Sequence, residues 1–589
     1  MSRILRVALP YGVFLAAALL SWNRWMEPFV DAGRELEVPR RIAQGERLYS
    51  DVRFFHGPLG PYAAAAVERV FPRRLPARIG LCALVALLHL EALRRLAGRL
   101  FRPWTAALAA SAVAGTSFFL RPGGCHLFPF SLDTSIAAAA AAGALLAVSG
   151  GRKRRDAAAG ACVLAALMAR PEMGLVVSAA LVAQAMLAPG EPGPAGRRLL
   201  LVAGAPAMLA ALLYAAVSWG TPLATLRSEG WLALLGPPGS FRNIYRAYAG
   251  LDLPGVRLAE LLLAAILLLL ILALIVLASF LARGSGEVAA NVAALLVGIL
   301  LAAAAAFLLW PGEAWRESVS LLPPLVRLVP PLVLAAAAAR AWRRIRRREE
   351  AREDAVPDAM LWVAAYFSAR MVLVAGYFGP YNAFLLPLSL LSALAIAASL
   401  LRRLEGRAGP ALPRIAAAAL GVFVAFRLAD TGAVFRRGAW SAVTTEAGTV
   451  VLPEPVAGAT RAALADLRQH LPPGRRLVGF PEGGFFTWSL GLVNPLPQEQ
   501  FFPGHLDAAE ERRTIARLTA EPPDAILMAN VLAVGHLARV FGNDYLGELD
   551  RTLHERFVPA ASYGPGAGPE AAIGDPQFFL EIRVPAPPP

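Results

Sequence analysis

The sequence has little charge and little cysteine. Only 17% of its 589 residues are charged, against 57% that are hydrophobic. No soluble globular protein could bury that much apolar surface, so the composition excludes that class. The three cysteines do not make a disulfide framework, and none lies at metal-ligand spacing from His or acidic residues, which argues against a structural zinc site. The chain also lacks the Walker A, G-x-S-x-G and H-E-x-x-H motifs.

The sequence contains many long apolar segments. A helix that spans a bilayer needs about 20 mainly apolar residues, and this length predicts about thirteen spans. They lie at 4–22, 77–97, 104–120, 133–149, 156–170, 171–188, 199–219, 257–282, 288–310, 323–341, 358–376, 381–401 and 412–428. The sequence therefore predicts an α-helical polytopic membrane protein, with the lipid bilayer as its solvent.

Basic residues between the spans predict the orientation. The net charge is +15, and with the N-terminus in the cytoplasm every strong arginine cluster falls on the cytoplasmic side, as the positive-inside rule requires. The clusters lie at 94–102, 152–155, 197–198, 343–348 and 402–407. The excess charge therefore indicates membrane topology, and no nucleic-acid partner. An odd number of spans places the C-terminal residues outside the cytoplasm.

The chain divides into a membrane module, residues 1–428, and an extracytoplasmic part, residues 429–589. The first outer loop of the membrane module is 23–76. Helix-like and strand-like runs alternate in the second part and predict a small α/β domain. The runs are Ala459–His470, Arg476–Phe480, Ala508–Ala520, Asp524–Met528 and Phe578–Val584, with the Gly/Pro-rich segment 561–576 expected as a loop.

Acidic residues gather at the outer ends of the spans. Asp31 and Glu35 follow the first span and would share one helix face, where Arg34 and Arg41 could pair with them. Asp133 opens the fourth span. A carboxylate at the membrane edge can act as a general base. The structural alternatives are a solvated interfacial helix for the first two residues and a helix N-cap for Asp133.

Three outer residues, two of them arginines, are candidates for binding the substrate. Arg170 and Glu172 form a corner between two short spans, and Arg121 lies in a neighbouring outer loop. Arginine is the side chain best suited to bidentate contact with phosphate. The alternative is an Arg170–Glu172 pair that neutralises itself at the interface.

Three further polar side chains accompany the outer loops. His56 lies in a turn-rich segment that ends at Tyr62, and a lone His is more often structural than functional. Tyr62 suits the interfacial aromatic belt. Arg370 falls within the predicted span 358–376 and should face a polar cavity or the bundle interior. We take all three as candidate substrate-binding residues.

Motifs in the first outer loop carry a family resemblance. They are Asp31-Ala32-Gly33-Arg34-Glu35, then Ala43 with Gly45-Glu46-Arg47-Leu48-Tyr49, then Gly57-Pro58-Leu59-Gly60-Pro61-Tyr62, together with Asp133. This pattern resembles the bacterial GT-C glycosyltransferases, which are relatives of the protein O-mannosyltransferases and of the aminoarabinose transferase that modifies lipid A. The motif similarity covers roughly residues 1–190.

The resemblance implies an inverting glycosyltransferase with a polyprenyl-phosphate-sugar donor and a protein, lipid or glycan acceptor. It implies Asp31 as the base, Asp133 as a supporting acid or metal ligand, and Arg170 at the phosphate. Many relatives carry two adjacent acids in this loop, whereas Ala32 and Gly33 follow Asp31 here. Whether Glu35 takes the second role, and whether a divalent cation (Mg or Mn) is needed, stays open.

Two other functions are also compatible with the sequence. A lipid or glycan transporter or flippase would carry polar residues deep in several spans, whereas the acids here collect at outer edges. A non-catalytic envelope scaffold would use the C-terminal domain as its binding module. In that case Asp31, Glu35 and Asp133 should each tolerate replacement by alanine.

Overall fold

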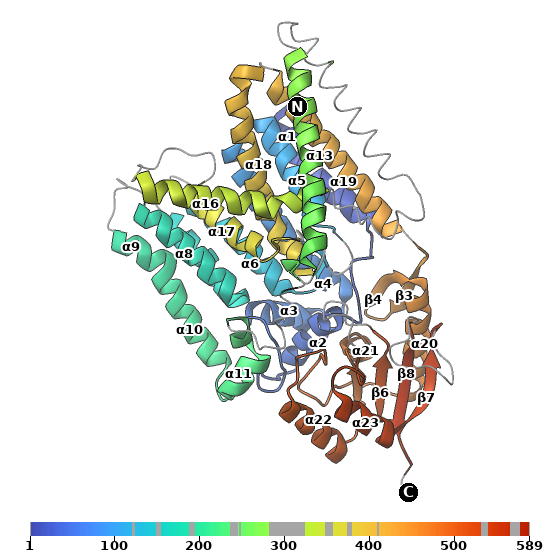
Figure 1. Ribbon diagram of the computed structural model, residues 1–589. Helices are drawn as coiled ribbons and strands as arrows, with labels where there is room; N and C mark the ends of the chain where they lie inside the picture. The colour runs from blue at the N-terminus through green and yellow to red at the C-terminus, as the bar shows by residue number, and fades with distance from the viewer. Residues whose placement is uncertain are drawn as a thin grey trace.

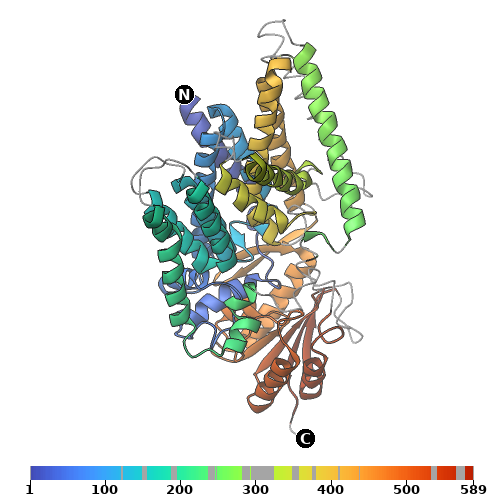
Figure 2. The same ribbon diagram turned by 60° about the vertical axis from the view of Figure 1, so that its left-hand side comes forward.

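The structure is a computed structural model, and most of its described residues are helical (Figure 1). It describes residues 2–120, 124–148, 155–187, 195–235, 246, 249–251, 253–281, 292, 324–347, 357–373, 380–408, 411–436, 438–531, 540–565 and 578–587. The N-terminus lies among the apolar helices, and the C-terminus lies at the opposite end of the molecule (Figures 1 and 2).

Apolar helices make up the larger part of the chain. The first six are α1 (Ser2–Leu20), α4 (Leu75–Leu100), α5 (Pro103–Ser117), α6 (Leu132–Val148), α7 (Arg155–Ala169) and α8 (Pro171–Leu187). The chain continues through α9 (Ala195–Leu199), a π-helical turn (Leu200–Gly204) and α10 (Ala205–Val217). The remaining ones are α13 (Pro254–Leu281), α16 (Val329–Arg347), α17 (Asp358–Ala369), α18 (Pro380–Ala408) and α19 (Leu412–Arg436).

Six helices of the described part are long and apolar enough to cross a membrane. They cover Arg3–Leu20, Leu75–Leu100, Gly196–Val217, Pro254–Phe280, Ala383–Arg403 and Leu412–Ala433. On α13, Leu262 and Leu269 are 64% and 66% exposed, as expected of side chains that face lipid. Shorter helices lie at other predicted spans, and the span 288–310 falls outside the described residues apart from Val292. The number thirteen therefore stays a prediction.

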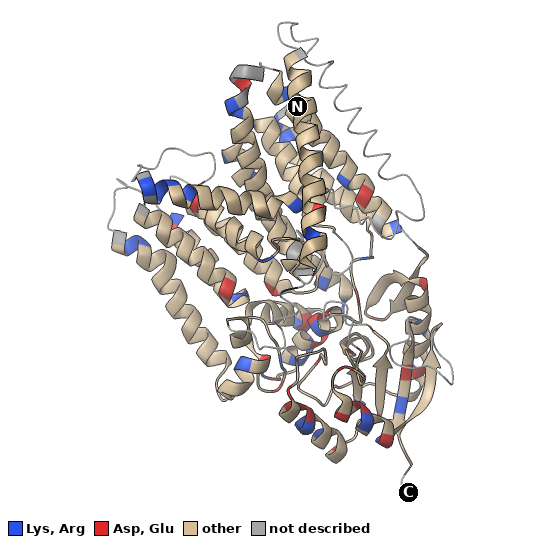
Figure 3. Cartoon of the chain, in the orientation of Figure 1, with Lys and Arg blue, Asp and Glu red and all other residues tan. Residues whose placement is uncertain are grey.

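Charge is sparse along the apolar helices and denser at several of their ends and among the C-terminal elements (Figure 3). Lys and Arg mark several helix ends, and acidic and basic residues mix where the bundle meets the C-terminal elements. Inside the bundle, small residues on α6 such as Ala137, Ala138 and Ala141 are fully or almost fully buried. Small side chains let neighbouring helices approach closely, which is how membrane helices pack without a hydrophobic driving force.

Short helices lie between the apolar bundle and the C-terminal elements. They are α2 (Ala32–Ala43) and α3 (Leu59–Val70) from the first loop and α11 (Leu223–Glu229) from a later one. In both ribbon views α2 and α3 lie beneath the apolar helices and next to the C-terminal elements (Figures 1 and 2). These connecting helices bring the first loop against residues more than 400 positions later.

The C-terminal elements form a mixed sheet with helices. In chain order they are β3 (Trp440–Thr445), β4 (Gly448–Pro453), α20 (Glu454–His470), β5 (Leu477–Phe480), α21 (Gly484–Leu490), α22 (Ala508–Ala520), β6 (Ala525–Ala529), α23 (Gly547–Arg556), β7 (Phe557–Tyr563) and β8 (Leu580–Pro585). The sheet order is β5-β6-β8-β7. Strands β5 and β6 are parallel, and β8 is antiparallel to both neighbours. The β3–β4 hairpin is separate.

Helices and strands lie where the sequence predicted them in this part, with additions. The hairpin, α21, α23 and β7 were not predicted, and β7 extends into the segment 561–576 that was expected as a loop. Helix α19 runs to Arg436, past the predicted boundary at 428, and one hydrophobic cluster contains both Phe367 of the bundle and Leu477 of the sheet. A division into two domains therefore stays a prediction.

Two glycines let α2 and α21 approach each other. A Cβ on Gly33 would lie 2.7 Å from Glu482 Oε1 and 2.7 Å from the Phe485 backbone nitrogen. A Cβ on Gly484 would lie 2.6 Å from the carbonyl carbon of Gly33. Because real Cβ contacts are longer than this, neither helix can carry a side chain at the crossing. This close approach gives a structural reason for the glycine in the D-x-G-x-E motif.

We predict that Gly33→Ala destabilises the fold by about 1–3 kcal/mol, the usual cost of overpacking. The measurement is the thermal unfolding midpoint in detergent. Gly98→Ala is the matched control, because nothing lies within 4 Å of a Cβ built on this helical glycine of α4. An unfolding midpoint for Gly33→Ala equal to that of the wild type would contradict the close packing of α2 on α21.

Candidate functional site

Asp31 lies immediately before α2, in an uncommon backbone conformation. Its φ is 67° and its ψ is −33°, and Asp tolerates a positive φ better than most residues do. Such conformations cost about 1–3 kcal/mol and persist where neighbouring contacts hold them. Asp31 Oδ1 accepts a hydrogen bond of 2.9 Å from Gln500 Nε2 and lies 3.0 Å from Arg34 Nη1. The side chain is 20% exposed, so this carboxylate is held in place and still reaches the surface.

Glu35 connects α2 to the start of α6. Its Oε1 accepts a hydrogen bond of 3.1 Å from Arg34 Nη2, and its Oε2 accepts one of 3.2 Å from the Leu132 amide. Burial raises the pKa of Glu35, although the charge of Arg34 opposes the shift. Arg34 also contacts Asp31, so one guanidinium joins the two acids of the D-x-G-x-E motif. The predicted pairing of Arg34 is confirmed.

Asp133 is fully buried and bonds across to the first loop. Its Oδ1 accepts a hydrogen bond of 2.7 Å from the Gly60 amide, while Oδ2 makes no hydrogen bond to any of the described residues. The N-terminus of α6 is capped by another residue, because Ser131 Oγ accepts from the Thr134 amide at 3.3 Å. The N-cap alternative for Asp133 is therefore wrong. A Cβ on Gly60 would lie 2.6 Å from the Asp133 carboxylate, so the glycine permits this contact.

Arg170 occupies the corner between α7 and α8 and is 1% exposed. Its Nη1 lies 2.8 Å from His56 Nδ1 and 3.3 Å from Thr134 Oγ1, and its Nε donates to Glu172 Oε1 at 2.8 Å. A guanidinium only donates, so His56 Nδ1 accepts and the ring proton lies on Nε2. Burial, together with the positive charge of Arg170, holds the pKa of His56 well below its ordinary value.

The second arginine predicted for this site meets the same carboxylate. Arg370 Nη1 lies 3.4 Å from Glu172 Oε1. The sequence predicted that Arg370 lies within a helix, and this prediction is wrong. Helix α17 ends at Ala369, and the chain turns at Arg370. The Arg170–Glu172 pair expected as an alternative is present, and Arg370 extends it. Two cations share one acid at the edge of the cluster.

One predicted residue, Tyr62, does not join this cluster in the structure. Tyr62 is 42% exposed on α3. Arg121 lies outside the described residues. The other candidates converge, since Asp133 is close enough to Glu35, Arg170 and Arg34 for their charges to act on it. The candidate site thus consists of the start of α2, the start of α6 and the α7–α8 corner.

Sequence reasoning missed two residues that complete the start of α2. Glu482 Oε2 accepts from the Asp31 amide at 2.7 Å and from Gln500 Nε2 at 2.8 Å, and its Oε1 accepts from the Arg34 amide at 2.9 Å. Burial, and then the charge of Asp31, raise the pKa of Glu482 to about 7. Because these partners lie about 450 positions apart in the chain, no local pattern could have identified them.

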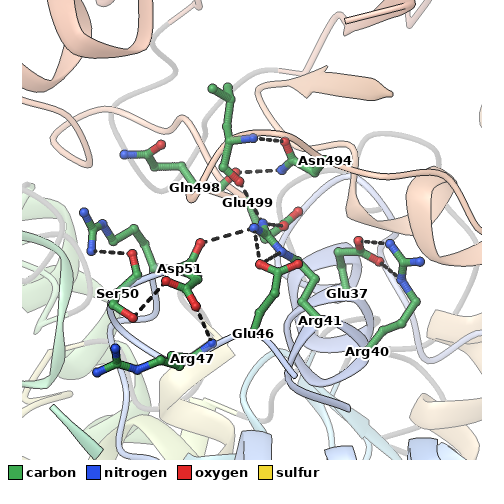
Figure 4. Close-up of polar contacts among 12 residues, drawn as sticks. Glu37, Arg40, Arg41, Glu46, Arg47, Ser50, Asp51, Asn494, Gln498 and Glu499 are labelled. Atoms are coloured by element: carbon green, nitrogen blue, oxygen red, sulfur yellow. Dashed lines mark hydrogen bonds and ion pairs between the residues drawn. The ribbon is translucent and has the colours of Figure 1, made fainter. Parts of the chain in front are cut away.

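The other end of α2 is held by the same part of the chain (Figure 4). Arg41 Nη1 donates to Glu499 Oε1 and Arg41 Nη2 donates to Glu46 Oε2 at 2.6 Å, while Arg40 Nη2 donates to the Leu492 carbonyl at 2.6 Å. Burial raises the pKa of Glu499 to about 7. Arg41 does not pair with Asp31 or Glu35, because ten residues separate it from Asp31, about 15 Å along a helix.

The acids of the candidate site do not form a cation-binding cluster. Among the residues that the structure describes, no group of three or more His, Cys, Asp or Glu side chains is arranged to hold a metal ion. Asp31 and Glu35 share Arg34, and Asp133 is bound to the Gly60 amide. This donor set does not fit a divalent cation, and we derive no step through one.

We predict that His56 stays neutral, with its proton on Nε2, at pH values where an ordinary histidine is already charged, because burial and Arg170 disfavour its charged form. The measurement is ¹⁵N NMR of histidine-labelled protein, with the His56→Gln variant used to assign the resonance. Titration of this resonance near the ordinary histidine pKa would contradict the assignment of Arg170 as the donor to Nδ1.

Comparison with known proteins places the fold. No protein-family model and no curated protein matches the chain. The oligosaccharyltransferase of Archaeoglobus fulgidus, tethered with an acceptor peptide, matches with a TM-score of 0.50 and 12% identity over 99% of this chain and 76% of that chain. The same enzyme with Zn and sulfate gives a TM-score of 0.48 at 14% identity, covering 95% and 72%.

ArnT from Cupriavidus metallidurans, bound to undecaprenyl phosphate, matches with a TM-score of 0.43 and 16% identity over 99% of both chains. Identities this low show the fold alone. The Archaeoglobus enzyme that matches with a TM-score of 0.50 is a GT-C glycosyltransferase, the fold that the resemblance in the sequence predicted. The chain therefore shares its overall fold with the Archaeoglobus oligosaccharyltransferase.

Proposed function

We propose that the protein is an integral-membrane glycosyltransferase that moves a sugar from a polyprenyl-phosphate-linked donor to an acceptor outside the cytoplasm. The donor class comes from the GT-C resemblance of the first outer loop, and the acceptor is a protein, lipid or glycan. In this proposal the N-terminus is cytoplasmic, the spans number about thirteen, and the candidate site faces the outer side of the plasma membrane.

One observation carries the proposal: the acids of the first loop converge with a buried arginine corner. Arg34 joins Asp31 to Glu35, Glu35 binds the Leu132 amide, and Arg170 contacts Thr134 two residues further on. Transfer from a lipid phosphate needs a base near the acceptor and a cation near the leaving group. This cluster contains both kinds of group: the carboxylates of Asp31 and Glu35, and the guanidinium of Arg170.

In the proposed reaction Asp31 is the general base. Its carboxylate takes the proton from an acceptor hydroxyl or amide as the acceptor atom attacks the anomeric carbon of the sugar. The bond between that carbon and the phosphate oxygen breaks, and the polyprenyl phosphate leaves with the electron pair. Attack from the face opposite the phosphate inverts the configuration at this carbon. Asp133, whose carboxylate accepts a hydrogen bond from the Gly60 amide, is a supporting acid in this proposal.

The proposed phosphate contacts are Arg170 and Arg370. Both arginines contact Glu172 Oε1, so a donor phosphate would compete with this carboxylate for the same cations. Arginine presents a planar fork that matches phosphate oxygens. Arg170 is held by His56 and Thr134 as well, which fixes the direction of its guanidinium.

We predict that Asp31→Asn lowers transfer by about 100-fold or more, the usual contribution of a general base. The measurement is incorporation of label from a panel of radiolabelled polyprenyl-phosphate sugars into membrane acceptors. Asp51→Asn is the matched control, because Asp51 is an exposed acid of the same loop whose Oδ2 accepts only from the Arg47 amide at 2.8 Å.

Label with the wild type and with Asp51→Asn, but not with Asp31→Asn, would support both the donor class and the base. Equal label in all three proteins would remove Asp31 from the reaction. No label from any donor with folded wild-type protein would contradict the proposed function and favour a transporter or a scaffold.

We predict that Arg170→Lys raises the KM for the donor by about tenfold, since lysine keeps the charge but loses the forked contact with phosphate. The exposed Arg69 on α3 supplies the control variant, Arg69→Lys, whose KM should equal that of the wild type. Steady-state kinetics at varied donor concentration give the answer. An unchanged donor KM in folded Arg170→Lys protein would argue against phosphate binding at this corner.

A further inference from the structure

The C-terminal part supplies the contacts that fix the proposed base. The segment 482–500 follows β5 and lies along α2 from end to end. At the Asp31 end this segment provides Glu482 and Gln500. At the far end it provides Glu499, which is drawn in Figure 4, and the backbone carbonyl of Leu492. The glycine crossing of Gly33 and Gly484 lies between these contacts.

Glu482 acts as the N-terminal cap of α2. The Asp31 side chain makes no capping hydrogen bond to its own helix. Glu482 accepts from the Asp31 and Arg34 amides instead, at 2.7 and 2.9 Å, so a carboxylate from the distant segment satisfies the free amides and the positive end of the helix dipole. These bonds hold Asp31 in its positive-φ conformation.

Gln500 fixes the direction of the Asp31 side chain. Its Nε2 donates to Asp31 Oδ1 at 2.9 Å and to Glu482 Oε2 at 2.8 Å, and its Oε1 accepts from Arg34 Nη1 at 2.7 Å. Both described contacts of the Asp31 carboxylate use Oδ1. The amide therefore orients this carboxylate by one oxygen and leaves the other for a proton from the acceptor.

We propose that Glu482 and Gln500 are positioning residues for Asp31, so that the C-terminal part completes the site of the first outer loop. This inference rests on the proposed function. Glu482 accepts its three hydrogen bonds best when it is ionised, because protonation adds an O–H donor to one of the two accepting oxygens. The charged groups that face Glu482 are Asp31 and Arg34, both from the start of α2, and with burial they set its pKa at about 7.

The test compares Glu482→Gln with Glu499→Gln in the full-length protein. Both variants remove a buried carboxylate of the segment 482–500 that contacts α2, but only Glu482 contacts the Asp31 end. We expect Glu482→Gln to lower kcat by about tenfold or more, with a donor KM within about twofold of the wild type. Glu499→Gln should keep the wild-type kcat. Thermal unfolding midpoints of both variants report any general loss of stability.

Two further readouts separate positioning from a structural role. The kcat of the wild type should fall as the pH is lowered through about 7, where Glu482 takes up its proton, and this fall should be absent in Glu482→Gln. Hydrogen exchange should quicken at the amides of residues 31–34 in Glu482→Gln but not in Glu499→Gln.

The outcomes distinguish the two proposals. If the wild type transfers sugar and Glu482→Gln keeps its kcat and its pH profile, the positioning role is wrong and the proposed function stands. If Glu482→Gln and Glu499→Gln lose kcat equally, the effect is general destabilisation and the positioning role is wrong. If the folded wild type transfers no sugar from any donor, the proposed function is wrong and the role in catalysis falls with it.

Discussion

The burial of charge in α2 is the constraint on which the rest of the structure depends. Five charged side chains of this one short helix, Arg34, Glu35, Glu37, Arg40 and Arg41, are 7% exposed or less. A buried charge without a partner costs several kcal/mol, and removing one member of a buried pair costs about 3–5 kcal/mol. Each of these side chains therefore needs a counter-charge or a hydrogen-bonding group, and most of the partners come from outside α2. The start of α6, the loop after α2 and the segment 482–500 all provide them.

This requirement joins the apolar helices to the segment 482–500 of the C-terminal part. Glu35 binds the start of α6, and Arg34 and Arg41 bind Gln500 and Glu499. The first loop thus lies between two parts of the chain and is held by both. A loop held in this way can keep a strained aspartate in place, which is useful where a reacting group must not move. Burial raises the pKa of both Glu482 and Glu499 to about 7, so protonation of either carboxylate would weaken its contacts with α2.

The sequence predicted what depends on local patterns. Apolar length located the apolar helices of the described part, and the D-x-G-x-E motif located Asp31 and Glu35 at the start of a helix. The Arg370 prediction was wrong in detail because hydropathy cannot locate the last turn of α17. The roles of Glu482 and Gln500 could not be predicted, because their partners lie far away in the chain and their own surroundings carry no periodic signal. For Asp133, the pattern could not decide between a cap and a contact with Gly60, since both suit an acid at a helix start.

A cryo-EM structure of the protein in nanodiscs with an added polyprenyl phosphate would test the phosphate site at Arg170. We expect phosphate density within hydrogen-bonding distance of the Arg170 guanidinium, between α2 and the start of α6, with Glu172 turned away from its present contact. Phosphate density at another place on the protein, or an Arg170 corner unchanged at saturating lipid, would contradict a lipid-phosphate site in this cluster.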